Sequence, residues 1–130
     1  MTSTEATLPN TEATLALVTR FENGFNARDV DATMADMTED CVFEHVAPEG
    51  VGFGRHEGQE AVRAVWESMD DHFPGYALEI FDIFASGDKA CCRYVLRWKN
   101  ADGSDGALHG VDVVTVRDGK VAQKLTYGTL

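Results

Sequence analysis

Apolar side chains recur at helical spacing in the first part of the chain. Within residues 11–27, Leu17, Phe21 and Phe25 follow one another every four residues, which predicts an amphipathic helix with one buried face. Asp29 then suits the N-cap of a short second helix. Two consecutive helices therefore open the predicted fold.

The remainder of the chain predicts a strand, a third helix and then four consecutive strands. The composition of residues 41–47 predicts the first strand, and apolar spacing over 58–73 predicts the helix, which ends at Pro74. The four later strands are expected near 77–85, 89–99, 107–117 and 120–127. Turn sequences that contain glycine separate these strands, as in hairpins. Helices first and strands last predict an α+β domain in which three helices pack on an antiparallel sheet.

Asp112 is a lone carboxylate within an apolar run, residues 110–116. The β-branched residues of this run predict a strand with at least one face in the core. If Asp112 faces the core, desolvation raises the pKa of its carboxyl group and suits it to proton transfer near neutral pH. If it faces water, only the neighbouring valines pack. Alternation places His109 on the other face of the strand, so a contact with Asp112 would require a bulge at Gly110.

The charge of the chain argues against two classes of partner. The 130 residues include 22 acidic and 11 basic side chains, for a formal net charge of −11. Such a charge repels nucleic acid backbones and anionic membrane surfaces, so we expect neither as a partner. The length suits one domain, and we expect residues 11–130 to form it. Residues 1–10 lack the basic start and apolar middle of a signal peptide, and we expect them to be a flexible leader.

The cysteines and histidines form no metal-binding motif. Cys91 and Cys92 are adjacent, and adjacent strand residues point to opposite faces, so a disulfide between them is disfavoured. Together with Cys41, they indicate a reducing, cytoplasmic setting. No cysteine pair has C-x-x-C spacing and no histidines form an H-E-x-x-H sequence, so we expect neither a metal nor another cofactor.

Four segments of the chain, residues 25–31, 38–44, 58–63 and 110–121, carry a resemblance to a known family. They resemble the SnoaL-like polyketide cyclase and ketosteroid isomerase branch of the nuclear transport factor 2-like superfamily. The element order is also similar to that of the superfamily. The resemblance implies a cone in which the sheet curves around an apolar pocket for a small molecule. It is specific for the fold and weak for the reaction, because this fold carries many activities.

The resemblance implies roles for three residues. Asp112 matches the carboxylic acid that donates a hydrogen bond in ketosteroid isomerases. His45, after Glu44, stands where those isomerases carry the carboxylate base, and a histidine can serve as a base near neutral pH. Phe21 stands in place of the tyrosine that binds the oxyanion, which argues against steroid isomerisation of the known kind. The alternative for His45 is a structural role, as a histidine hydrogen-bonded at the rim of the pocket.

Aromatic residues are the other candidate pocket components, because they combine apolar area with one polar group. The candidate substrate contacts are Phe21, Trp66, Tyr94, Trp98 and Tyr127. Each of them could instead belong only to the core.

Two functions follow as hypotheses. In the first, Asp112 and His45 carry acid/base proton transfer on a hydrophobic carbonyl or polyketide-like substrate, as in an isomerase or cyclase. In the second, the domain is a non-catalytic module that binds a small ligand or dimerises. We also expect a homodimer, because the outer side of the sheet would otherwise expose valines such as Val111 and Val113.

Overall fold

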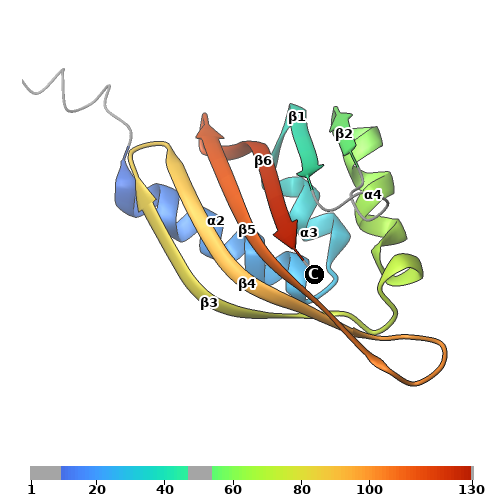
Figure 1. The fold of residues 1–130 in the computed structure, drawn as a ribbon. Coiled ribbons are helices and arrows are strands. Elements are labelled where there is room, and N and C mark those ends of the chain that lie inside the picture. The colour runs from blue at the N-terminus through green and yellow to red at the C-terminus, as the bar shows by residue number, and fades with distance from the viewer. Residues whose placement is uncertain (1–9, 47–53, 130) are drawn as a thin grey trace, which may run out of the picture.

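In the part of the chain that the structure describes, six strands form one curved sheet and the helices lie on one side of it (Figure 1). This computed structural model describes residues 10–46 and 54–129. In chain order, the elements are α2 (Thr11–Asn26), α3 (Val30–Ala35), β1 (Met37–Val46), β2 (Gly54–Glu57), α4 (Gln59–His72), β3 (Ala77–Ser86), β4 (Lys89–Lys99), β5 (Asp105–Arg117) and β6 (Lys120–Thr129). The predicted α+β fold is confirmed.

The strand order is β2-β1-β6-β5-β4-β3. Strands β3 to β6 form the predicted antiparallel meander, and β1 and β2 pair antiparallel as well. However, β1 runs parallel to β6, so the sheet is mixed and not wholly antiparallel as expected. Strands β1 and β6 lie far apart in the sequence, and turn sequences hold no information about a contact between distant segments.

The helix ends follow the predicted capping, with local differences. Asp29 caps α3 by accepting a hydrogen bond from the Ala32 backbone amide at 3.1 Å. Asn10 caps α2 in the same way, so this residue belongs to the domain, whereas residues 1–9 of the expected leader lie outside the described residues. The first strand begins at Met37 instead of residue 41, and β2 was not predicted.

The helices cover the concave face of the sheet and bury its inward-facing side chains. Helix α2 packs on β3 and β4, and α4 packs on β1 and β2. On β5 the buried residues alternate with half-buried ones, and Leu108, Gly110, Asp112 and Val114 face inward. Asp112 is completely buried, at 0% exposure, which decides between the two orientations left open by the sequence. No described helix has the length and apolar character that crossing a membrane requires.

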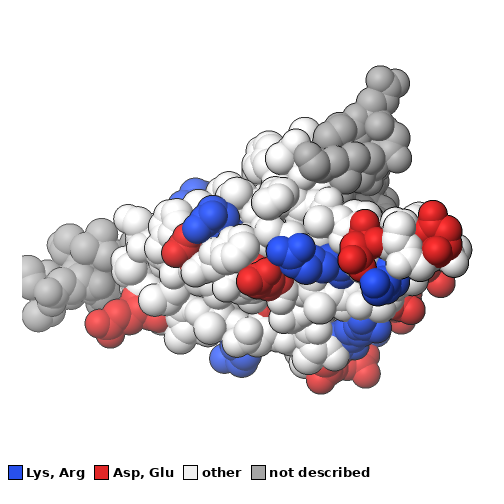
Figure 2. Space-filling view, turned by 60° about the horizontal axis from the view of Figure 1, so that its bottom comes forward, with Lys and Arg blue, Asp and Glu red and all other residues white. Residues whose placement is uncertain are grey.

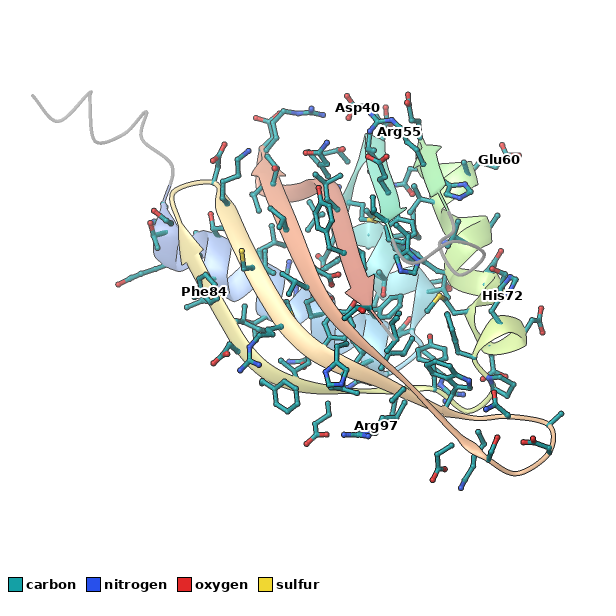
Figure 3. All side chains as sticks on the ribbon, in the orientation of Figure 1. Asp40, Arg55, Glu60, His72, Phe84 and Arg97 are labelled. Atoms are coloured by element: carbon teal, nitrogen blue, oxygen red, sulfur yellow. The ribbon has the colours of Figure 1, made fainter. Side chains whose placement is uncertain are left out.

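The outer surface carries many of its charges as adjacent pairs of opposite sign. Figure 2 shows acidic and basic side chains next to one another on the face that it presents. The pairs on β3, β4 and β5 are Arg93–Asp82, Arg97–Glu79 and Lys99–Asp105. In Figure 3 the labelled charged residues lie at the periphery, while other side chains fill the space between sheet and helices. Exposed pairs of this kind contribute little to stability.

The ring of Tyr94 lies across β5 at Gly110, its partner in the β4–β5 register. A Cβ atom at Gly110 would approach the tyrosine ring to 2.6 Å, far inside van der Waals contact. Glycine at this position therefore lets Tyr94 lie flat over the strand. The register is regular through Gly110, so no bulge brings His109 toward Asp112, and His109 is exposed on the outer face.

We predict that Gly110→Ala destabilises the domain by about 1–3 kcal/mol, because the added methyl group must displace the Tyr94 ring. Gly24→Ala in α2 is the matched control. Its Cβ would meet no atom closer than 3.5 Å, and alanine is the better helix former by up to about 1 kcal/mol. Urea denaturation measures both variants. Equal stability of Gly110→Ala and the wild type would show that Tyr94 does not pack as described.

Candidate functional site

Four side chains from four neighbouring strands lie in one row on the concave face. His45 of β1 pairs in register with Thr126 of β6, Thr126 with Asp112 of β5, and Asp112 with Cys92 of β4. Neighbouring strands lie about 4.8 Å apart, so one strand separates the backbones of His45 and Asp112 by about 10 Å. The sheet therefore brings the two predicted catalytic residues to the same face without direct contact between their backbones.

Asp112 accepts two hydrogen bonds at one carboxylate oxygen. The Thr126 hydroxyl donates to Oδ1 at 2.6 Å, and the Tyr94 hydroxyl donates to the same oxygen at 3.1 Å. Burial, followed by the charge of Asp112, raises the pKa of Tyr94 well above its ordinary value, so the phenol keeps its hydrogen. Two neutral donors therefore fix the position of the buried carboxylate.

Lys124 supplies the buried positive charge of the site. Its Nζ lies 3.4 Å from Asp112 Oδ2 and 3.8 Å from Glu22 Oε1, and its side chain is 3% exposed. Four aromatic rings surround the ammonium group at 4.2 to 5.7 Å, which adds cation–π attraction. These rings belong to Phe21, Phe25, Phe43 and Trp66.

The carboxylates keep Lys124 charged in spite of its burial. Burial alone lowers the pKa of the amine, but the charges of Asp112 and Glu22 outweigh it, and the pKa lies above the ordinary value of 10.5. Lys124 is therefore an ammonium donor at neutral pH. It is not a free amine that could form a Schiff base with a carbonyl compound.

Glu22 reaches the same cluster from helix α2 and is completely buried. Burial, followed by the charge of Asp112, raises the pKa of Glu22 well above 4.5, although Lys124 opposes the shift. Cys92 lies beside the two carboxyl groups, and burial raises the pKa of its thiol far above the ordinary value. The thiol is therefore inert as a nucleophile at neutral pH.

His45 is also buried, at 6% exposure, but its pKa shifts downward, whereas those of Lys124, Glu22 and Cys92 shift upward. Burial lowers the pKa of its imidazole below 6.5, the charge of Lys124 lowers it further, and Asp112 offsets part of the shift. The imidazole is therefore neutral at pH 7. A neutral imidazole can accept a proton from a ligand.

A small apolar cavity lies between the sheet and α4, with polar groups on its sheet side. The cavity has a volume of about 20 Å³. A single water needs about 10–15 Å³, so the side chains nearly fill the cone. The lining residues are Phe25, Phe43, His45, Trp66, Met69, Phe73, Leu78, Tyr94, Leu96, Leu108, Lys124 and Thr126. Asp112 is absent from this lining, because its partners Tyr94, Lys124 and Thr126 form the wall in front of it.

The structure brings some predicted substrate contacts to the cavity and not others. Trp66 and Tyr94 line it. Phe21 is fully buried in the core, with its ring 5.6 Å from Lys124 Nζ. Trp98 lies outside the lining and donates its Nε1 hydrogen to Asn100 at 2.9 Å. Tyr127 lies on the outer face of the sheet, 48% exposed.

Lys124 and Glu22 were not predicted as site residues, although both left a signal in the sequence. In β6 the polar Lys124 and Thr126 alternate with the apolar Leu125 and Tyr127, and the usual assignment would place the polar pair in water. In the structure, Lys124 and Thr126 instead point into the core, and Tyr127 is exposed. Glu22 follows Phe21 within the apolar stripe of its helix, where a carboxylate is unusual.

The buried cluster also has the composition of a metal site. Glu22, Cys92 and Asp112 place one potential ligand atom each within 4.8 Å of one another. However, the Lys124 ammonium lies against both carboxyl groups. The position that a cation would take is therefore already held by this side chain.

The family of the chain follows from a sequence match that spans the site. The model of the SnoaL-like domain family matches residues 18–124, from helix α2 to Lys124 in β6. This chain belongs to the SnoaL-like domain family. No curated protein matches it.

Solved structures similar to this SnoaL-like domain share its fold. An NTF2-like protein of unknown function from Mesorhizobium loti is 29% identical, with a TM-score of 0.73 over 91% of this chain and 92% of its own. A proposed polyketide cyclase from Xanthomonas campestris pv. campestris is 25% identical, with a TM-score of 0.74 over 90% of each chain. A proposed ketosteroid isomerase from Kribbella flavida is 23% identical, with a TM-score of 0.71 over 92% of this chain and 80% of its own.

We predict that Lys124→Met destabilises the domain by about 3–5 kcal/mol, because it leaves the Asp112 carboxylate buried without its cation. Lys99→Met is the matched control, since Lys99 pairs with Asp105 in an exposed position, and its loss should cost less than about 1 kcal/mol. Chemical denaturation of both variants gives the comparison. Similar losses in the two variants would mean that Lys124 does not carry the buried charge.

Proposed function

We propose that this SnoaL-like domain catalyses acid/base proton transfer on a small hydrophobic carbonyl compound, as an isomerase or cyclase does. One observation carries the proposal: a neutral histidine and a buried ammonium group line the same largely apolar cavity. The likeness to a proposed polyketide cyclase at 25% identity supports a substrate with carbonyl groups.

In the proposed reaction, His45 removes a proton from the carbon next to the carbonyl group. The neutral imidazole accepts that proton, the electrons of the C–H bond form a carbon–carbon double bond, and the π electrons of the carbonyl group move onto its oxygen to give an enolate. In a ligand with a second carbon–carbon double bond conjugated to the enolate, the imidazolium then returns the proton to the far carbon of that system, and the carbonyl group re-forms to give the isomer. A base placed in this way typically contributes about 10²–10⁴-fold to the rate.

Lys124 stabilises the enolate oxygen in this proposal. Its ammonium group lines the cavity and remains charged, so it can meet negative charge as it develops in a site that excludes water. This donor replaces the tyrosine that is absent at Phe21. Tyr94 and Thr126 already donate their hydrogens to Asp112, which leaves Lys124 as the stronger donor toward a ligand.

Asp112 acts through Lys124 and Tyr94, without contact with the ligand. The carboxylate holds the ammonium group at 3.4 Å and the phenol at 3.1 Å on the far side of the cavity wall. It is therefore a positioning residue in the proposed reaction. This assignment replaces the direct acid/base role that the family resemblance implies for Asp112 with an indirect one.

A ligand must enlarge the cavity as it binds. Ligand sites typically occupy about 300–1,000 Å³, whereas the cavity measures about 20 Å³. The side chains of Trp66, Met69 and Phe73 lie between the polar groups and α4, and their movement would open the space.

The same small volume supports a second candidate function. A nearly filled cone suits a non-catalytic module that binds a small ligand weakly or serves dimerisation. In that case the buried cluster only holds α2 against the sheet.

Hydrogen exchange at carbon distinguishes the two candidates without knowledge of the natural substrate. We expect the protein to accelerate deuterium incorporation next to the carbonyl group of at least one ketone in a panel of cyclic and polycyclic ketones in D₂O, followed by NMR. We predict that His45→Gln lowers this acceleration by about 100-fold or more.

His109→Gln is the control for this experiment, because His109 is exposed on the outer face of the same sheet. It should exchange the ketone as fast as the wild type. Binding of ketones without any acceleration would favour the non-catalytic module, and equal rates in His45→Gln and the wild type would refute the role of His45.

We also propose that the domain forms a homodimer through the outer face of the sheet. Exposed aromatic side chains lie there, with Phe81 at 44% and Tyr127 at 48% exposure. Together with Val111 they line a groove of about 340 Å³. A two-fold axis through this face would bury the groove of each protomer against the same surface of its partner.

We predict a dimer mass by light scattering at micromolar concentration, and a monomer for Val111→Asp, because the new charge would be buried at the interface. Leu15→Asp is the control, since Leu15 is an exposed apolar residue on α2, and this variant should remain dimeric. A monomeric wild-type protein would contradict the proposed interface.

A further inference from the structure

The buried cluster holds one positive charge and two carboxyl groups. Glu22 and Asp112 are both at 0% exposure, and among the described residues Lys124 is the only Lys or Arg within 4.0 Å of either. If both carboxyl groups were ionised, the core would hold an uncompensated negative charge. Burial of such a charge costs several kcal/mol, so the cluster favours the retention of one proton.

The hydrogen bonds of the cluster indicate where this proton lies. The Cys92 thiol, a weak donor, lies against Glu22, and the Lys124 ammonium lies against Asp112, but among the described residues no donor meets either Glu22 oxygen or Asp112 Oδ2 in good hydrogen-bond geometry. One oxygen of Glu22 lies within 4.8 Å of one oxygen of Asp112, and a hydrogen shared between the two carboxyl groups would give both of them a partner. Asp112 Oδ1 already accepts from Thr126 and Tyr94, and Lys124 lies 0.4 Å nearer to Asp112, at 3.4 Å, than to Glu22, at 3.8 Å. Asp112 is therefore the ionised partner.

We propose that Glu22 is protonated at neutral pH and donates its hydrogen to Asp112, so that it sets the net charge of the site to zero. The ionisable groups that face Glu22 are Asp112 from β5, Lys124 from β6, and Cys92 and Tyr94 from β4. Helix α3 and strand β3 also pack on α2, but their described residues bring no ionisable group to Glu22. The direction of the pKa of Glu22 agrees with this assignment.

A protonated Glu22 has a consequence for the proposed reaction, and this part rests on the proposed function. While Glu22 is neutral, Lys124 balances Asp112 alone and can meet a developing enolate. Once Glu22 ionises at high pH, a second carboxylate competes with the ligand for the same ammonium group. Glu22 is thus a positioning residue whose loss of a proton weakens enolate stabilisation.

Infrared spectroscopy tests the protonation directly, because a protonated carboxyl group and a carboxylate absorb at separate frequencies. We expect a buried, protonated carboxyl band in the wild type at pH 7, and its loss in Glu22→Gln. Glu12→Gln is the matched control, because Glu12 is an exposed glutamate on the same helix, and it should retain the band. Absence of the band in the wild type, or its persistence in Glu22→Gln, would overturn the proposal.

The pH dependence of stability gives a second readout that also uses the wild type. Above about pH 4.5 the unfolded chain releases the Glu22 proton while the folded protein keeps it. Stability therefore falls as the pH rises toward the folded pKa, and this group raises the unfolding constant by up to about tenfold per pH unit. Between about pH 4.5 and the folded pKa of Glu22, the wild type should lose stability relative to Glu22→Gln. Parallel pH profiles of the two proteins would contradict a protonated Glu22.

These readouts need no substrate, so they separate the present inference from the proposed function. If the band is present at pH 7 but the protein never accelerates ketone hydrogen exchange, the protonation of Glu22 would be supported and the proposed catalytic function would be refuted. If the exchange activity is found, Glu22→Gln should abolish its decline at alkaline pH. An unchanged decline in Glu22→Gln would refute the positioning role of Glu22.

Discussion

The buried ion pair between Lys124 and Asp112 organises the concave side of this domain. Two donors and one cation fix Asp112, and Asp112 in turn keeps Lys124 charged within a ring of aromatic side chains. Removal of either partner would leave an unpaired buried charge, which is far more costly than the loss of an exposed pair. The concave face of the sheet therefore carries a polar cluster in an otherwise apolar core.

The buried polar cluster affects both the stability of the domain and its proposed proton-transfer chemistry. A buried ion pair is a weak source of stability compared with apolar packing of the same volume, so its presence calls for another explanation. The cluster borders the cavity through Lys124, Tyr94 and Thr126, and His45 faces the same space as a neutral base. A charged donor and a neutral acceptor on one wall are the elements of proton transfer next to a carbonyl group. The SnoaL-like family to which the chain belongs supplies the fold, and the proposed reaction would depend on these side chains.

Much of the architecture could be predicted from the sequence, because periodicity and turns act locally. The stripe of Leu17, Phe21 and Phe25 and the glycine-containing turns were sufficient for the helices and the meander. The parallel pairing of β1 with β6 could not be predicted in this way, since it depends on contacts between distant segments. The apolar run around Asp112 indicated a strand, and only the packing of α2 over the sheet decided which face was buried.

The side chains of the site were harder to predict, because their positions follow from cross-strand register. Lys124 was missed since a lysine in an alternating strand is usually exposed, and here the polar face is the inner one. NMR titration of the Lys124 side chain, followed at Cε, measures whether the carboxylates hold the buried ammonium group. The amine in the folded protein should titrate above the ordinary pKa of 10.5, because the carboxylates outweigh burial. A midpoint below 10.5, as burial alone would produce, would show that the carboxylates do not hold this charge.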